Sequence, residues 1–116
     1  MTSHDVTSRV GARSREQVED ALARLEYIGD PPFEASRFHR GALDGYRWAL
    51  SRSPLAPITE SVASGPDGPC PAQLGAEQQA AQVREQDERL GAEERDHARG
   101  VRAALAWVSG RSDVQP

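Results

Sequence analysis

One short motif in this chain has the residue types and spacing of a metal site. Glu94 and His97 are three residues apart, so on a helix they lie one turn apart on the same side. Helical di-iron proteins use this Glu-x-x-His spacing, but they need a second such motif and further inward carboxylates. Another segment of the chain offers Ser36 and His39 at the same spacing, with serine in place of the glutamate. We therefore interpret His97 as a histidine at the edge of the core and predict no metal and no other cofactor.

Acidic residues form two further clusters with some resemblance to a known site. They are Glu16, Glu19 and Asp20 in one segment and Glu85 and Glu88 in another. This is similar to all-α nucleotide pyrophosphohydrolases, which bind Mg²⁺ through Glu-x-x-Glu pairs on an inward face. In this chain the acids fall on the outward faces of the predicted helices, which favours a solvated surface. A metal- or nucleotide-handling enzyme is therefore the third interpretation that we keep.

The sequence has no motif for nucleophilic catalysis or for binding phosphate through lysine. There is no Gly-x-Ser-x-Gly, and the single cysteine, Cys70, has no histidine near it in sequence. The chain contains no lysine, so a phosphate loop of the Walker type is excluded. With one cysteine, no internal disulfide can form. These observations predict a protein that is not an enzyme.

The arginines are the residues with which this chain could bind a nucleic acid. Arg40 and Arg47 share the polar strip of one predicted helix, and Arg99 and Arg102 lie on the polar side of another. In a dimer the two strips could follow a phosphate backbone. The net charge of −4 argues against a general nucleic-acid binder, and a solvated strip paired with nearby acids is the favoured interpretation.

A repeat relates the two segments that must position these residues. The pattern Arg-Gly, then Trp, then Arg-Ser begins at Arg40 and occurs again from Arg99, at a constant offset of 59 residues from 40 to 99 and from 48 to 107. Both tryptophans of the chain belong to it. The repeat indicates a duplicated helical unit, although chance similarity between two Ala- and Arg-rich helices is the alternative.

Small residues at helical spacing mark the place where the two copies should meet. The first copy has two glycines four residues apart, and the second has a glycine and an alanine at the same spacing. Glycine inside a helix costs about 1 kcal/mol relative to alanine, so we expect it to have a packing role. We predict that the copies cross at these residues, with a tryptophan beside the crossing on each helix. The predicted crossing residues are Gly41, Gly45, Trp48, Gly100, Ala104 and Trp107.

Turn and capping residues divide the chain into helices. Ser14 and Gln17 form a capping box that starts a helix over about 15–28, and Pro31-Pro32 prevents its continuation. A second helix runs from the mid-thirties to about residue 52, and a Pro/Gly-rich loop follows over 53–72. Residues 73–90 form a strongly polar third helix with a thin apolar stripe of Ala80, Val83 and Leu90. Residues 92–109 form the fourth.

The layout is therefore all-α, with two helical hairpins in tandem. Whether Gly91 separates two helices or kinks one long helix is open at this stage. The length of 116 residues suits one domain over 14–110, preceded by a disordered arm over 1–13 and followed by a tail over 111–116. No apolar run is long enough for a signal peptide or a membrane span, so we expect a cytoplasmic protein that does not bind membranes.

Composition also bears on partners. Hydrophobic residues make up 37% of the chain and aromatic residues 5%, which is a small supply for a core. The second predicted helix is nevertheless apolar on nearly all sides. Part of this surface should therefore be buried against a partner, most simply a second copy in a homodimer. The polar third helix, which lacks a strong apolar stripe, is expected to bind another protein.

Three segments resemble a group of small uncharacterised actinobacterial proteins: FHRGALDGYRWAL, PLAPITE and ARGVRAALAWV. The resemblance covers about half of the chain and agrees with a high-GC source, which the absence of lysine and asparagine also indicates. It implies no activity and no site residues. The function that the sequence favours is a non-enzymatic protein–protein interaction or adaptor protein, and the alternative is a small DNA-associated regulator.

Overall fold

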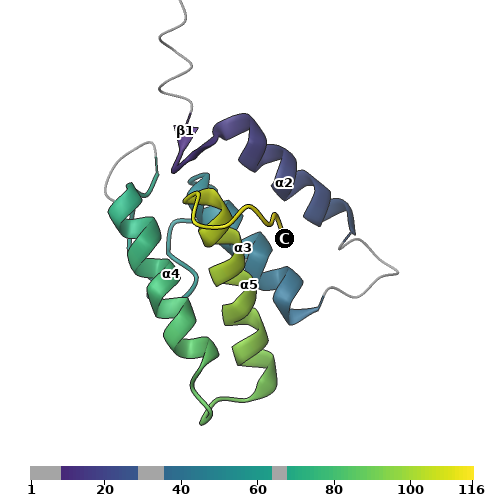
Figure 1. The fold of residues 1–116 in the computed structure, drawn as a ribbon, viewed down its shortest axis with the longest axis vertical. Helices are drawn as coiled ribbons and strands as arrows, with labels where there is room; N and C mark the ends of the chain where they lie inside the picture. Colours follow the sequence, from purple (N-terminus) through teal and green to yellow (C-terminus); the bar gives the residue numbers. More distant parts are fainter. Residues whose placement is uncertain (1–8, 29–35, 64–67) are drawn as a thin grey trace, which may run out of the picture.

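A computed structural model describes residues 9–28, 36–63 and 68–116 (Figure 1). The main elements of this part of the chain are four helices, α2 (Arg15–Ile28), α3 (Arg37–Ala49), α4 (Pro71–Glu85) and α5 (Ala92–Val108). Helices α2 and α3 run in opposite directions as one hairpin, and α4 and α5 form the other (Figure 1). Helices α3 and α5 lie together at the centre and run in the same direction. The predicted all-α fold of two tandem hairpins is confirmed.

The helix boundaries follow local capping chemistry. At the start of α2, the Ser14 hydroxyl accepts a hydrogen bond from the Gln17 backbone N–H at 3.1 Å. The Gln17 side chain accepts one from the Ser14 N–H at 2.9 Å, which completes the predicted capping box. Gly91 has extended backbone and is the N-cap of α5, so α4 and α5 are separate helices. Helix α4 ends at Glu85, five residues before the predicted position, and a turn joins it to α5.

The backbones of α3 and α5 touch at two glycines. A Cβ atom at Gly41 would overlap the carbonyl oxygen of His97, and a Cβ at Gly100 would overlap the carbonyl oxygen of Phe38. The two overlaps are equivalent, because Phe38 and His97 occupy the same position in the repeat. One turn further along, a Cβ at Gly45 would lie 3.3 Å from the Cβ of Ala104. The glycines are therefore required by a close approach of two backbones.

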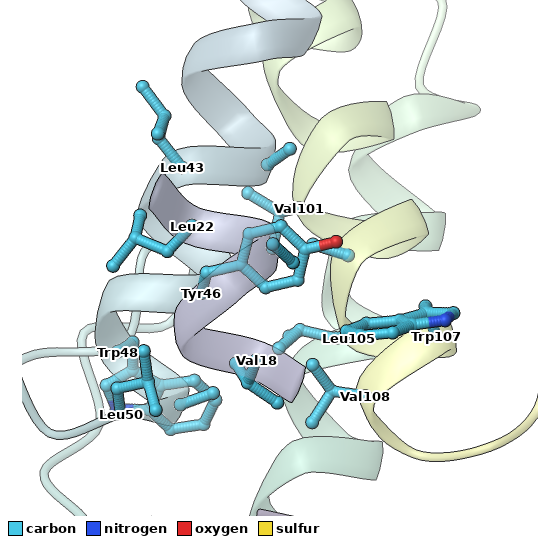
Figure 2. Close-up of a cluster of buried hydrophobic side chains, with 14 of the residues drawn as sticks. Val18, Leu22, Leu43, Tyr46, Trp48, Leu50, Val101, Leu105, Trp107 and Val108 are labelled. Atoms are coloured by element: carbon cyan, nitrogen blue, oxygen red, sulfur yellow. The ribbon is translucent and has the colours of Figure 1, made fainter. Parts of the chain in front are cut away.

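The two tryptophans occupy different places around this crossing. Trp107 lies between the helices, where its ring meets the edge of Tyr46 with centroids 6.0 Å apart and planes at 85°. Trp48 is also buried, and its label lies well away from that of Trp107 in Figure 2. The Tyr46 hydroxyl is buried without a hydrogen-bond partner in the described part of the chain. Burial raises the pKa of Tyr46 above its ordinary value, although Arg13 opposes the shift, so this phenol stays protonated.

The repeat continues through the ends of the two central helices. After α3, Ser51 has a positive φ of 64°, and the N–H of Arg52 donates to the carbonyl of Arg47 at 2.7 Å. After α5, Gly110 has a φ of 77°, and the N–H of Arg111 donates to the carbonyl of Ala106 at 2.9 Å. Both ends are Schellman motifs. The offset of 59 residues therefore holds in hydrogen bonding as well as in sequence.

The prediction of a disordered arm over 1–13 is wrong for its last five residues. Strands β1 (Arg9–Val10) and β2 (Arg13–Ser14) form a two-stranded antiparallel sheet around Gly11, whose φ is 62°. The N–H of Ala12 donates to the carbonyl of Val108 at 2.8 Å. The Arg13 guanidinium lies 4.7 Å from the centre of the Trp107 ring, a cation–π contact. These contacts fix the segment to the end of α5. Residues 1–8 of the predicted arm lie outside the described residues.

Alanine substitutions test the crossing. Gly41→Ala and Gly100→Ala should each lower the free energy of unfolding by about 3 kcal/mol or more, because the new methyl group meets backbone that cannot move aside. Gly45→Ala is the matched control in the same helix. Its effect should stay within about 1 kcal/mol, because the gain in helix propensity offsets mild crowding. Urea denaturation of the three variants measures these differences, and equal losses in all three would contradict the close approach.

Candidate functional site

Helix α4 buries a side that differs from its thin apolar stripe. Leu74, Glu77 and Ala81 are its buried residues, whereas Val83 is 62% exposed. The thin apolar stripe of Ala80, Val83 and Leu90 does not supply this buried side. The reason is that a glutamate occupies the centre of the buried side, where hydrophobic periodicity alone cannot find it.

Glu77 holds the loop that follows α3 against α4. Its side chain is 2% exposed, and its carboxylate accepts hydrogen bonds from the backbone N–H groups of Ile58 and Thr59. It also accepts one from the Thr59 hydroxyl at 2.6 Å. A buried carboxylate is tolerated when several donors satisfy it. An isolated antiparallel bridge between Leu55 and Val62 closes the same loop. Glu77 therefore fixes Ile58 and Thr59 beside α4.

Two neighbouring cavities lie beside α4, and the larger one reaches this loop. The smaller has a volume of about 210 Å³ and is lined by charged and polar side chains from three helices: Arg37, Arg84, Glu93, Glu94 and His97. The larger has a volume of about 570 Å³ and is lined by Ile58, Thr59, Ala80, Val83, Arg84, Asp87, Leu90 and Glu94. Arg84 and Glu94 line both, so the two cavities are neighbours along α4 and the start of α5, and the larger one also reaches the loop. We call the two cavities together the α4–α5 cleft.

Most charged groups around the α4–α5 cleft are already paired. A guanidinium nitrogen of Arg37 lies 3.4 Å from a carboxylate oxygen of Glu93. The backbone N–H and the guanidinium of Arg89 both donate to the Asp87 carboxylate, at 3.0 Å each. These hydrogen bonds lower the pKa of Asp87 to about 2. By contrast, the side chains of Arg84 and Glu94 form no ion pair or hydrogen bond with any described residue. Among the described residues, the cleft therefore presents one cation and one anion that are not paired.

Glu85, at the end of α4, pairs with arginines of α5. Its carboxylate accepts hydrogen bonds from Arg102 and, at 3.2 Å, from Arg99. Burial would raise the pKa of Glu85, but the two guanidinium groups outweigh it and hold the pKa below its ordinary value of 4.5. The Arg95 side chain donates to the backbone carbonyl of Glu85 at 3.0 Å. Three arginines thus bind the end of α4 to α5.

His97 binds a carboxylate at the side of the crossing. Its Nε2 lies 2.8 Å from an Asp44 carboxylate oxygen, and its side chain is 25% exposed. Since the carboxylate can only accept, Nε2 carries the proton and donates. Glu94 lines the cleft next to His97, but the described residues include no group of three His, Cys, Asp or Glu side chains arranged to hold a metal ion. The contact with Asp44 matches the interpretation of His97 as an edge-of-core histidine.

The four arginines that were candidates for phosphate contacts do not form free strips. Arg99 and Arg102 share Glu85, and Arg47 binds Glu26 of α2 at 3.1 Å. Arg40 is exposed and forms no ion pair with a described residue. Three of the four charges are therefore already compensated by acids.

Comparison with known proteins identifies no relative of this chain. It matches no protein-family model, no curated protein and no solved structure at a significant level. No helix in the described ranges has the length and apolar character that a membrane span requires. Evidence for function therefore has to come from the chain's own surfaces.

Removal of the Glu77 carboxylate should release the loop. Glu77→Ala leaves the Ile58 and Thr59 donors without an acceptor and opens a space in the core, so we expect a loss of about 2–4 kcal/mol in the free energy of unfolding. Glu77→Gln keeps one acceptor oxygen and should lose clearly less. Thermal and urea denaturation measure both variants. A Glu77→Ala protein as stable as the wild type would show that the carboxylate does not hold the loop.

The stability contributed by Glu85 should depend on pH. A folded-state pKa below 4.5 means that this contribution is complete above 4.5 and is lost as the pH falls through the folded pKa. At neutral pH, Glu85→Gln should therefore be less stable than the wild type by about 1–3 kcal/mol. The difference in unfolding free energy between the wild type and Glu85→Gln should shrink gradually as the pH falls below 4.5. Urea denaturation across this range measures it, and a difference that does not change with pH would contradict the assignment.

Proposed function

We propose that the protein is a non-enzymatic interaction protein that binds its partner through the outer face of α4. The observation that carries this proposal is the absence of charge on that face. From Pro71 to Val83 the only charged residue is Glu77, and Glu77 is buried. Charged residues make up 28% of the whole chain, so an exposed helix face without charged residues is unusual for this protein. The centres of protein interfaces are depleted in charge in the same way.

The spacing of the exposed residues supports a helical partner. Positions 72, 76, 79, 83 and 86 alternate steps of four and three, which is the spacing of a coiled-coil seam, and they lie opposite the buried side of α4. We call this set the α4 outer face: Ala72, Ala76, Gln79, Val83 and Gln86, all exposed. Alanine at two of these positions lets another helix approach closely, as the small residues do at the α3–α5 crossing.

A second copy of the chain is the simplest partner. An uncharged face placed against itself across a two-fold axis brings no like charges together. A helix of this length gives a small contact area, so the dimer should be weak unless the neighbouring loop around Leu55 and Val62 adds to it. Both of these side chains are largely exposed, at 45% and 69%.

The alternative of a DNA-associated regulator has less support. Its arginines would have to leave Glu26 and Glu85 before they could bind phosphates, and each broken pair reduces the gain. For an enzymatic function, the described part of the chain offers only single side chains and no set of cooperating groups.

A charge placed in the α4 outer face tests the proposal. Ala76→Glu should weaken self-association more than about tenfold, because two like charges would meet without water between them. Ala23→Glu, on the exposed side of α2, is the matched control and should associate like the wild type. Analytical ultracentrifugation over a range of concentrations measures the effect. A wild type that stays monomeric throughout would rule out the homodimer. Equal association of Ala76→Glu and wild type would place the interface elsewhere.

A further inference from the structure

The α4–α5 cleft contains two opposite charges that do not pair with each other. Arg84 and Glu94 line both cavities, yet no ion pair joins them and neither side chain binds another described residue. Around them, Arg37 pairs with Glu93 and Asp87 with Arg89. Opposite charges on long side chains that face the same space and remain apart leave room for a group between them. A ligand that carries both charges would satisfy both residues.

Apolar side chains share the larger cavity with these charges. Ile58, Val83 and Leu90 line it together with Thr59, Asp87, Arg84 and Glu94. Ile58 cannot move away freely, because its backbone N–H donates to the buried carboxylate of Glu77. The cleft therefore combines two opposite charges with apolar side chains. One of these, Ile58, belongs to a loop that the buried carboxylate of Glu77 holds in place. Its cavities, of about 210 and 570 Å³, have room for a small organic molecule.

We propose that the α4–α5 cleft binds the zwitterion of an apolar α-amino acid. The Arg84 guanidinium binds the carboxylate through charge-assisted hydrogen bonds, and the Glu94 carboxylate binds the ammonium group. The aliphatic side chain lies against Ile58 and Leu90. A phosphorylated ligand fits less well, because one unpaired cation stands beside an unpaired anion. An internal residue of a peptide carries neither charge, so it would leave both Arg84 and Glu94 unsatisfied.

Calorimetric titration with leucine tests the ligand class. We expect saturable binding of leucine and much weaker binding of three matched compounds. N-acetylleucine lacks the ammonium charge, leucinamide lacks the carboxylate, and glycine lacks the apolar side chain. The titrations use the Ala76→Glu protein as well as the wild type, so that self-association through the α4 outer face does not affect the result. Absence of saturable leucine binding, or equal binding of N-acetylleucine or leucinamide, would overturn the proposal.

Two substitutions test the residues. Arg84→Gln and Glu94→Gln should each weaken leucine binding about tenfold, as expected for the loss of one charge-assisted hydrogen bond. Both side chains are exposed and bind no other described residue, so the melting temperature should not change. Arg24→Gln, on the exposed surface of α2, is the matched control and should bind leucine like the wild type. Unchanged leucine affinity in both cleft variants would show that the zwitterion is not held between these charges.

Discussion

The contact between the backbones of α3 and α5 at Gly41 and Gly100 determines where the other elements lie. Because neither residue has a side chain, each helix packs against the carbonyl group of the other. This short distance brings Asp44 within hydrogen-bonding reach of His97 and places Trp107 against Tyr46. Helix α2 then covers α3, and α4 covers α5 (Figure 1). A larger residue at either glycine would separate the helices and remove all of these contacts together.

The two hairpins have the same order of helices, and the candidate cleft lies where equivalent side chains of α2 and α4 differ. At the constant offset of 59 residues, Val18 and Leu25 of α2 correspond to Glu77 and Arg84 of α4. In α2 both side chains are buried in the apolar core. In α4 the first is a buried acid that holds the loop, and the second is an exposed cation in the cleft. Two apolar positions of the first hairpin thus carry polar roles in the second. This difference makes the second hairpin the functional candidate.

The sequence was sufficient for the features that depend on neighbouring residues. Ser14 and Gln17 predict the start of α2, because the two residues act within one helical turn. The spacing of Gly41 and Gly45 predicts a crossing, because small residues one turn apart leave room for a second backbone. The hairpin over 9–14 was missed because two-residue strands have no periodicity and because Arg13 bonds to Trp107, 94 positions away. Glu77 was missed for a similar reason, since its partners Ile58 and Thr59 belong to a loop. The seven-residue spacing of Leu74 and Ala81, with Glu77 between them, is the one local signal of its inward direction.

The separation of paired and unpaired charge follows from helix geometry at the end of α4. Arg84 and Glu85 are consecutive, so their side chains point about 100° apart. Glu85 points to α5, where Arg99 and Arg102 neutralise it and Arg95 binds its carbonyl. These bonds stabilise the negative end of the α4 dipole and fix the rotation of the helix about its axis. With that rotation fixed, Arg84 must face the cleft rather than the arginine cluster, which repels it. The residues that stabilise the second hairpin therefore also determine which charges remain available for a ligand.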